Sequence, residues 1–364
     1  MWYRPKNEAS IFTPAILVYP DRIEENIRRM IALAGDADRL RPHVKTHKLG
    51  ELIKLQIQLG ITRFKCATLS EVEMVAVNGG MDILLAYPLL GPAIQHFLQL
   101  TERYPKTRFS VTVDSLAACR QLGYQTRISG KAVNLFVDLD NGMHRTGIEP
   151  GKALELIEFI LEDESLEFAG LHIYDGHIHE VDFEERKTHC NADFESVNKL
   201  VQELESNAIT VGELACGGTP TFPIHAKHKS RTLCPGTPVL WDAGYKKAIP
   251  DLDFLPAAVI AGRVISQPAG QLCLDLGYKS IASEMTHPRL HFLNLEHKGV
   301  VNHSEEHLVV STDKAKNFKE GELVYALPTH VCPTMALHEQ VYVVREQLVV
   351  DVWKVVARKR VYNP

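Results

Sequence analysis

The sequence lacks the features that mark membrane, secreted and nucleic-acid-binding proteins. No apolar run approaches the length of a transmembrane helix, and the N-terminal stretch MWYRPKNEAS has no signal-peptide pattern. The seven cysteines include no C-x-x-C pair, which argues against a disulfide framework. The net charge of −5 leaves no basic excess for phosphate contacts. We therefore expect a cytoplasmic protein that acts on a small molecule, with no membrane or nucleic-acid partner.

Short β-rich runs alternate with segments of helical periodicity over much of the chain. The expected strands cover 39–45, 63–68, 82–88, 108–114, 132–140, 168–175, 211–218 and 232–242. Expected helices between them include 50–60, 91–104, 152–164 and 190–206. Eight strands that alternate with helices predict an α/β fold of the (β/α)₈ barrel (TIM barrel) type, with a doubly wound open sheet as the alternative.

The pattern changes to period two after Tyr245, with glycine and charged turns between the runs. Such a pattern is typical of a compact β-domain. We place the barrel at 21–246 and the C-terminal β-domain at 247–364. The run PAILVYP, at 14–20, can pair with that β-domain, so residues 1–20 are assigned to it as well.

The stretch RPHVKTHK, at 41–48, ends the first expected strand. Barrel enzymes carry their chemistry at the C-terminal ends of the strands, so Lys45 is expected to point its amine into the barrel mouth. Burial favours the neutral, nucleophilic form of a lysine, which suits it to a Schiff base. The alternative is a solvated lysine in a basic loop, flanked by His43 and His47.

Two glycine-threonine turns follow the last two expected strands, GGTPT at 217–221 and PGTPV at 235–239. Barrels that hold a phosphorylated ligand bind its phosphate with the backbone N–H groups of these two loops. The phosphate-binding candidates are Gly217, Gly218, Thr219, Gly236 and Thr237. Together with Lys45 they predict pyridoxal 5′-phosphate (PLP) as the cofactor.

Two further strand ends fit a PLP site. Arg145, in DLDNGMHRTGI, can hydrogen bond the pyridine nitrogen, or it can form an ion pair with a nearby aspartate. Tyr174, in IYDGHIH, can contact the cofactor ring, or it can be a core residue. An arginine partner would leave the ring nitrogen unprotonated and make PLP a weaker electron sink. The reaction would then need assistance from a second group.

That help can come from PTHVCPT, at 328–334. On a strand His330 and Cys332 would face the same side. An imidazole and a thiol suit zinc, with water or substrate completing an open coordination shell. The alternative is a buried cysteine beside a hydrogen-bonded histidine.

The HIH run, His177 to His179, raises a rival interpretation. Metal-dependent hydrolase barrels carry such a pair on the first strand, whereas here it follows the sixth, so this interpretation ranks below PLP. Three other histidines, His189, His225 and His228, are expected at the surface.

Six motifs, in chain order, resemble the metal-activated PLP enzymes of the D-threonine aldolase and D-serine dehydratase family. They are RPHVKTHK, DNGMHRTG, GLHIYDGH, CGGTPT, CPGTPVLWD and THVCPT followed by LHEQVYVV. The resemblance implies the alanine racemase-like fold (fold type III), which is a PLP barrel followed by a β-domain.

The same resemblance assigns roles to the candidate residues. Lys45 binds PLP covalently, Arg145 meets the pyridine nitrogen and Tyr174 contacts the cofactor. The two glycine-threonine loops hold the phosphate, while His330 and Cys332 bind a divalent metal, with zinc first and manganese or magnesium as alternatives. The resemblance also implies a homodimer that acts on D-configured 3-hydroxy amino acids.

The member of the family is left open between two lyases. Cysteine at 332 favours a D-serine dehydratase-type elimination to a 2-oxo acid and ammonia. The alternative is a D-threonine aldolase-type cleavage to glycine and an aldehyde. Aldolases of this family have a histidine six residues after the tyrosine, where this chain has Glu180, so His177 or His179 would have to replace it. Less favoured are an amino-acid racemase and a non-catalytic PLP-carrier protein, which would lack the β-domain.

Overall fold

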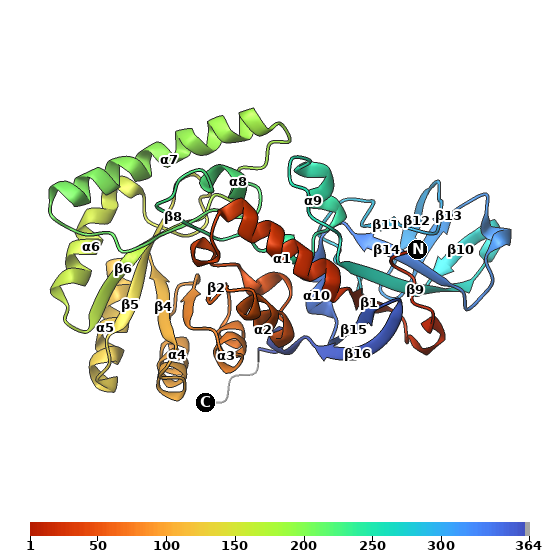
Figure 1. Ribbon diagram of the computed structural model, residues 1–364, viewed down its shortest axis with the longest axis horizontal. Coiled ribbons are helices and arrows are strands. Elements are labelled where there is room, and N and C mark those ends of the chain that lie inside the picture. Colours follow the sequence, from red (N-terminus) through yellow and green to blue (C-terminus); the bar gives the residue numbers. More distant parts are fainter. Residues whose placement is uncertain (361–364) are drawn as a thin grey trace. The chain divides into compact units, whose positions relative to one another are not determined.

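The computed structural model describes residues 1–360, which divide into two compact units (Figure 1). The barrel unit comprises Met30–Lys45, Gly50–Gly236 and, at the end of the described chain, Lys359 and Arg360. The β unit comprises Met1–Arg29, Thr46–Leu49 and Thr237–Arg358. The domain limits expected from the sequence, 21–246 against 1–20 with 247–364, stay a prediction.

A parallel sheet of seven strands forms the centre of the barrel unit, and its strand order follows the chain order from β2 to β8. This is the order of a (β/α)₈ barrel, so the predicted fold class is confirmed and the doubly wound alternative is wrong. The strands are β2 (Arg63–Cys66), β3 (Asp82–Leu85), β4 (Arg108–Val113), β5 (Val133–Leu139), β6 (Leu166–Ile173), β7 (Leu214–Cys216) and β8 (Arg231–Leu233).

The first of the eight expected strands, 39–45, is not a regular strand. Only two isolated parallel bridges connect it, one from Leu40 to Leu233 on β8 and one from His43 to Lys65 on β2. The segment therefore joins the two outer strands of the sheet. Pro42 lies between the two bridges and has no N–H to donate to a ladder, which explains why the pairing is interrupted. The short 3₁₀ helix η3 (Val44–Thr46) follows.

The helices of the barrel unit connect successive strands, and several begin or end with recognisable caps. Ser115 accepts a hydrogen bond from the N–H of Ala118 at the start of α5, and Gly130 ends that helix in the left-handed conformation. The helices are η2 (Ala37–Arg39), α2 (Gly50–Gln58), α3 (Leu69–Val77), α4 (Pro92–Arg103), α5 (Leu116–Ser129), η4 (Pro150–Lys152), α6 (Ala153–Glu162), α7 (Phe183–Ser206) and α8 (Phe222–His225). Helix α1 (Pro20–Ala34) precedes them.

An antiparallel sheet dominates the β unit. Strand β1 pairs with β9 on one side and β15 on the other, so the N-terminal run 14–20 contributes a strand to this sheet. The strands are β1 (Ala15–Val18), β9 (Ala258–Ser266), β10 (Gln271–Leu274), β11 (Leu290–Phe292), β12 (Gly299–His303), β13 (Leu308–Ser311), β14 (Leu323–Pro328), β15 (Gln340–Arg345) and β16 (Leu348–Lys354).

Short helices complete the β unit, and its core packs around the buried rings of Tyr19 and Tyr325. The helices are η1 (Glu8–Ser10), η5 (Thr237–Val239), α9 (Ala243–Ala248), η6 (Pro268–Gly270), η7 (Ala315–Asn317), α10 (Val331–Leu337) and η8 (Val356–Arg358).

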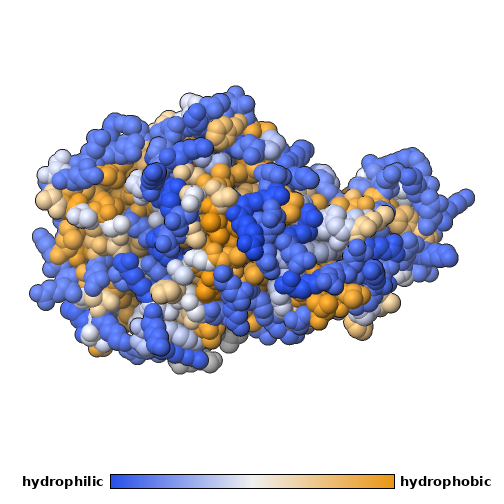
Figure 2. Space-filling view, in the orientation of Figure 1, coloured by the Kyte–Doolittle hydropathy of each residue, from blue (hydrophilic) through white to orange (hydrophobic). Residues whose placement is uncertain are grey.

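Hydrophilic side chains cover much of the face shown in Figure 2, with apolar patches between them. Single exposed apolar residues are normal for folded proteins and carry no argument by themselves. Among residues 1–360 no helix combines the length and the apolar character that crossing a bilayer would require.

Candidate functional site

Three cationic side chains of the barrel unit surround one aromatic ring. The ring centroid of Tyr174 lies 5.7 Å from Nζ of Lys45, 5.4 Å from Nζ of Lys65 and 4.9 Å from the guanidinium carbon of Arg145. A Cβ at Gly176 would lie 2.4 Å from the hydroxyl of Tyr174, so the ring needs glycine at that position. The structure thus brings Lys45, Arg145 and Tyr174 together, as the sequence predicted, and adds Lys65.

Lys65 belongs to a buried relay that the sequence reasoning missed. Its Nζ lies 3.4 Å from Nε2 of His172, and Nδ1 of His172 lies 2.6 Å from Oδ1 of Asp138. Burial lowers the pKa of His172, so the neutral ring is favoured, with Nδ1–H donating to Asp138 and Nε2 accepting from Lys65. Burial would raise the pKa of Asp138, but the bonds from His172 and Thr146 lower it overall. The sequence signal was a lysine between the apolar residues Phe64 and Cys66 on β2.

The loops after β7 and β8 contact each other through a backbone N–H. Gly217 has a φ of +75°, which favours glycine, and the N–H of Gly218 donates to Thr221. The N–H of Gly236 donates to Oγ1 of Thr219 over 3.3 Å. Four of the five predicted phosphate-binding residues therefore lie on two linked loops of the barrel unit. The fifth, Thr237, belongs to the β unit.

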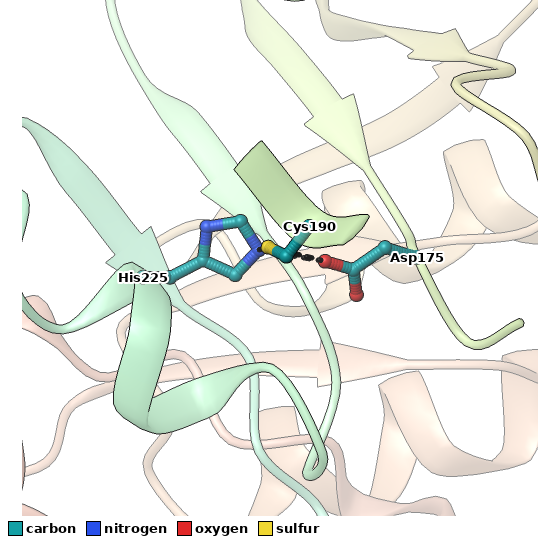
Figure 3. Close-up of side chains that lie close together, drawn as sticks. All are labelled: Asp175, Cys190 and His225. Carbon is teal, nitrogen blue, oxygen red and sulfur yellow. Dashed lines mark hydrogen bonds and ion pairs between the residues drawn. The ribbon is translucent and has the colours of Figure 1, made fainter. Parts of the chain in front are cut away.

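A buried polar network supports the loop after β7 (Figure 3). Asp175 accepts a hydrogen bond from Nε2 of His225 over 2.7 Å and another from Oγ1 of Thr221. Arg231 donates to Nδ1 of His225, which fixes the position of the ring proton on Nε2. His225 is fully buried, so its prediction as a surface residue is wrong. It is on the short helix α8, which carries it inward.

Cys190 also contacts this network, with its Sγ 3.7 Å from Nε2 of His225 and 3.8 Å from Oδ2 of Asp175. Burial raises the pKa of the Cys190 thiol, and the charge of Asp175 raises it further. The protonated thiol is therefore favoured, which argues against Cys190 as a nucleophile.

The predicted metal pair belongs to the β unit but is not on a strand, so that part of the prediction is wrong. Strand β14 ends at Pro328, His330 is the N-cap of α10 and Cys332 is in its first turn. A proline at 333 fits the first turn of a helix and not an interior strand. The two side chains still lie close in the chain at the start of this helix, and Cys332 is among the groups that raise the pKa of His330.

The surroundings of the pair orient both donor atoms. Oε1 of Glu284 lies 2.6 Å from Nδ1 of His330. Burial would lower the pKa of His330, but the hydrogen bonds with Cys332 and Glu284 raise it to about 9. The thiol of Cys332 donates to Oγ1 of Thr46 over 3.3 Å, and Oγ1 of Thr237 lies 3.7 Å from its sulfur. Thr46 is the residue after Lys45 in the chain.

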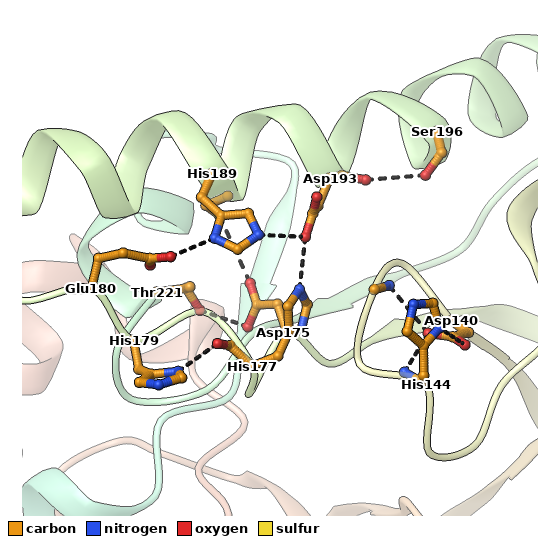
Figure 4. Close-up of polar contacts among 12 residues, drawn as sticks. Asp140, His144, Asp175, His177, His179, Glu180, His189, Asp193, Ser196 and Thr221 are labelled. Carbon is orange, nitrogen blue, oxygen red and sulfur yellow. Dashed lines mark hydrogen bonds and ion pairs between the residues drawn. The ribbon is translucent and has the colours of Figure 1, made fainter.

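The two histidines of the HIH run point in different directions (Figure 4). Nε2 of His177 lies 2.7 Å from Oδ2 of Asp193 on α7. His179 is exposed, and its Nδ1 bonds the carbonyl of His177. Glu180 contacts Nδ1 of His189 and does not face either of them. Nδ1 of His177 is buried without a hydrogen-bond partner among residues 1–360, whereas the ring of His179 is exposed to solvent.

Comparisons with known families cover most of the chain. Residues 18–239 match the family model for the alanine racemase N-terminal domain. Residues 257–344 match the family described as "Putative serine dehydratase domain".

Individual relatives align over almost the full length. D-threonine aldolase from an Arthrobacter species is 29% identical over 359 residues, which is 96% of this chain and 93% of that protein. The structure of D-threonine aldolase from Filomicrobium marinum has a TM-score of 0.89 and 26% identity, covering 98% of this chain and 97% of the other.

A third relative is a dehydratase. The structure of D-threo-3-hydroxyaspartate dehydratase from Delftia sp. HT23 has a TM-score of 0.80 and 22% identity, covering 95% of this chain and 97% of the other. A variant of that enzyme with one cysteine replaced by alanine has been solved in a metal-free form.

Proposed function

The chain belongs to the family of the alanine racemase N-terminal domain and is a PLP-dependent lyase of D-hydroxy amino acids, and on this premise we propose that it carries out a metal-assisted elimination. The products would be a 2-oxo acid and ammonia, as for a D-serine dehydratase. The observation that carries the proposal is the placement of His330 and Cys332 two residues apart at the start of α10, with a carboxylate of Glu284 on Nδ1 of His330.

The residues of the barrel unit fit PLP. The amine of Lys45 and the guanidinium of Arg145 both lie near the phenol ring of Tyr174. Lys45 would hold the cofactor covalently and Arg145 would meet its ring nitrogen. Gly217, Gly218, Thr219, Gly236 and Thr237 would hold its phosphate. When bound, PLP supplies an electron sink for the bonds at the substrate's α-carbon.

The residues of the β unit fit a divalent metal. His330 and Cys332 offer one nitrogen and one sulfur ligand, and Glu284 orients the imidazole from Nδ1 as carboxylates do for metal-bound histidines. We propose zinc, with manganese or magnesium as alternatives. A metal there supplies Lewis acidity toward the substrate hydroxyl.

Within this scheme the chain's own groups move the protons. Nζ of Lys45 would take the proton from the substrate's α-carbon, and the hydroxyl would leave as hydroxide. Lys65 is held by His172 and Asp138 in a fixed position beside Tyr174. Its ammonium would keep the ring of Tyr174 in place through a cation–π contact.

The second candidate is aldolase-type cleavage to glycine and an aldehyde. The full-length similarity to D-threonine aldolase favours it. It requires a base for the hydroxyl proton, and of the two predicted histidines His179 suits this role better, because His177 is engaged by Asp193. An amino-acid racemase is the third candidate and would need no metal.

Product identification with D-threonine, with and without EDTA, tests the proposal. Elimination gives 2-oxobutanoate and ammonia, and both should disappear on chelation and return when zinc is added. Glycine and acetaldehyde in place of these products would establish the aldolase and refute elimination. L-allo-threonine, the product of inversion at the α-carbon alone, would establish a racemase if it forms equally with and without EDTA.

We also propose that the chain acts as a homodimer with a D-amino acid as its small-molecule partner. Light scattering on the purified holoenzyme measures the mass directly. A mass near that of one 40.8 kDa chain at working concentration would refute the dimer.

A further inference from the structure

A second group of metal-ligating side chains lies in the barrel unit, between the loop after β6 and helix α7 (Figure 4). His177 comes from the loop, while His189 and Asp193 are four residues apart on one face of α7. One ligand atom from each of the three lies within 4.8 Å of the others. This His₂Asp set is separate in sequence from His330 and Cys332 and has no role in the proposed elimination.

The arrangement around His189 is that of a metal-bound imidazole. Oε1 of Glu180 lies 2.6 Å from Nδ1 of His189, so the carboxylate accepts the ring N–H there. The other ring nitrogen, Nε2, faces Oδ2 of Asp193 at 3.3 Å. A carboxylate on the far nitrogen is also the usual partner of a histidine that binds zinc.

His177 approaches the same carboxylate oxygen from the loop. Its Nε2 lies 2.7 Å from Oδ2 of Asp193, and the rings of His177 and His189 are 5.5 Å apart at their centroids. Two atoms of the cluster, Nδ1 of His177 and Oε2 of Glu180, are buried and have no hydrogen-bond partner within residues 1–360. Two polar atoms of the cluster can therefore still form a hydrogen bond or bind a ligand.

Charge and packing also favour a cation. The carboxylates of Asp193 and Glu180 both face His189 and bring negative charge to the group. Gly142, with a φ of +128°, packs directly on it, because a Cβ there would lie 2.7 Å from Nε2 of His177 and 3.0 Å from Oδ2 of Asp193. The loop of Arg145 therefore forms a wall of the cluster without occupying it.

We propose that His177, His189 and Asp193 bind a divalent transition-metal ion, zinc first, with Glu180 orienting His189 and water completing the shell. Two imidazoles and one carboxylate are a ligand set that zinc accepts. The side chains are partly exposed, with 20%, 38% and 24% of His177, His189 and Asp193 accessible, so the ion can enter from solvent. The ion would fasten the loop after β6, which carries Tyr174 and His179, to α7.

Zinc titration of the PLP-loaded, EDTA-stripped enzyme tests the proposal, with bound metal counted after equilibrium dialysis. We expect two zinc ions per chain for the natural sequence and one for His189→Ala and for Asp193→Asn. Cys332→Ala should also bind one, and the pair His189→Ala with Cys332→Ala none. His144→Ala removes another exposed histidine that bonds a carboxylate, Asp140, and should still bind two.

Cobalt distinguishes the two sites by their ligands. A cobalt ion at Cys332 shows thiolate charge-transfer absorption, whereas one held by His177, His189 and Asp193 shows only ligand-field bands. In Cys332→Ala the ligand-field bands should persist, and adding His189→Ala should remove them. Glu180→Gln keeps all three ligands and should weaken zinc binding about 10–100-fold without changing the number bound.

Three results would overturn the proposal: an unchanged zinc count in His189→Ala, no metal bound by Cys332→Ala, or equal zinc affinity in Glu180→Gln and the natural sequence. Far-ultraviolet circular dichroism controls for folding, and Glu180→Gln serves if a ligand variant does not fold. Because metal is counted without substrate, the outcome is independent of whether the chain catalyses elimination.

Discussion

Nε2 of His225 donates a hydrogen bond to Oδ2 of Asp175 over 2.7 Å, and neither side chain is more than 1% exposed. Asp175 follows Tyr174 in the chain, and through Thr221 it also holds the loop that begins with Gly217. One buried carboxylate therefore fixes both the residue beside the proposed cofactor and the proposed phosphate loop. This relationship makes Asp175 a positioning residue.

Replacing Asp175 by Asn should destabilise the fold by about 3 kcal/mol, because it removes the buried carboxylate that compensates the charge of Arg231 and accepts from His225. It should also weaken PLP binding. Urea unfolding measures the first effect and equilibrium dialysis of PLP the second. Asp253→Asn changes a carboxylate that is 94% exposed and paired with Arg29, and it should stay within about 0.5 kcal/mol of the natural sequence.

The same carboxylate predicts a pH dependence of stability. Burial would raise the pKa of Asp175, but His225 and Thr221 lower it below the usual 3.8. The folded state thus binds its proton less tightly than the unfolded chain does. The contribution of Asp175 is complete above about pH 4 and is lost as the pH falls through the depressed pKa. The free energy of unfolding, measured as the pH falls below about 4, should decrease less steeply for Asp175→Asn than for the natural sequence. An equal decrease in the two proteins would refute this account.

Lys45→Ala should abolish covalent attachment of PLP and reduce turnover of D-threonine by about 10²–10⁴-fold or more, because both the attachment point and the proton acceptor are lost. Borohydride treatment followed by peptide mass spectrometry locates the attachment. Lys54→Ala, at an exposed position on α2, is the matched control and should behave like the natural sequence. Label on any peptide other than that of Lys45 would contradict the assignment.

The sequence predicted the barrel well because its signals are local. Buried parallel strands appear as short apolar runs, and β2 to β8 each overlap one of seven expected strands, although β8 ends at Leu233 and most of the expected run 232–242 is not strand. The remaining expected strand, 39–45, contains Pro42. The two bridges beside that proline are made to β8 and β2. Pairing between segments that are separated in sequence leaves no periodic signal.

Candidate site residues could be selected from the sequence where a local motif marks them. They could not be selected where contacts between distant segments determine the position of a side chain. Strand ends pointed to Lys45, Arg145 and Tyr174, and both cationic groups lie near the ring of Tyr174, while their roles stay a prediction. His225 looked like a surface residue because its neighbours are polar, yet a four-residue helix turns it inward. Period-two spacing misled the assignment of His330 and Cys332 to a strand, although Pro333 already favoured a helix start. The contact of His177 with Asp193 joins a loop to a helix, and no local pattern encodes it.

Cys332→Ala should remove metal-dependent activity, since it deletes one of two protein ligands proposed for the ion beside His330. The variant should lose the response of product formation to added zinc and to EDTA, measured with D-threonine. Cys273→Ala, on β10 of the same unit, removes a thiol that is not near this pair in the chain and should keep the response. Full EDTA-sensitive activity in Cys332→Ala would exclude this cysteine as a ligand.

The buried ion pairs of Arg41 are expected to stabilise the fold. Arg41 is fully buried and pairs with both oxygens of Glu213, at 2.9 and 2.8 Å, and with Oδ1 of Asp82 at 2.9 Å. Arg41→Met should cost about 3–5 kcal/mol in urea unfolding, because it leaves two largely buried carboxylates without their main counter-charge. Arg103→Met breaks an exposed pair with Glu73 and should cost less than about 1 kcal/mol.

The pH dependence of that loss separates the charge effect from packing. Burial would raise the pKa of Glu213, and Arg41 is the main group that lowers it. Without Arg41 the carboxyl should bind a proton at a higher pH in the folded state, so the variant regains stability as the pH falls toward 5. A cost that is the same at pH 5 and pH 8 would mean that lost packing, and not the unpaired carboxylates, destabilises the variant. Adding Glu213→Gln should recover part of the cost at pH 8 only if charge is the cause.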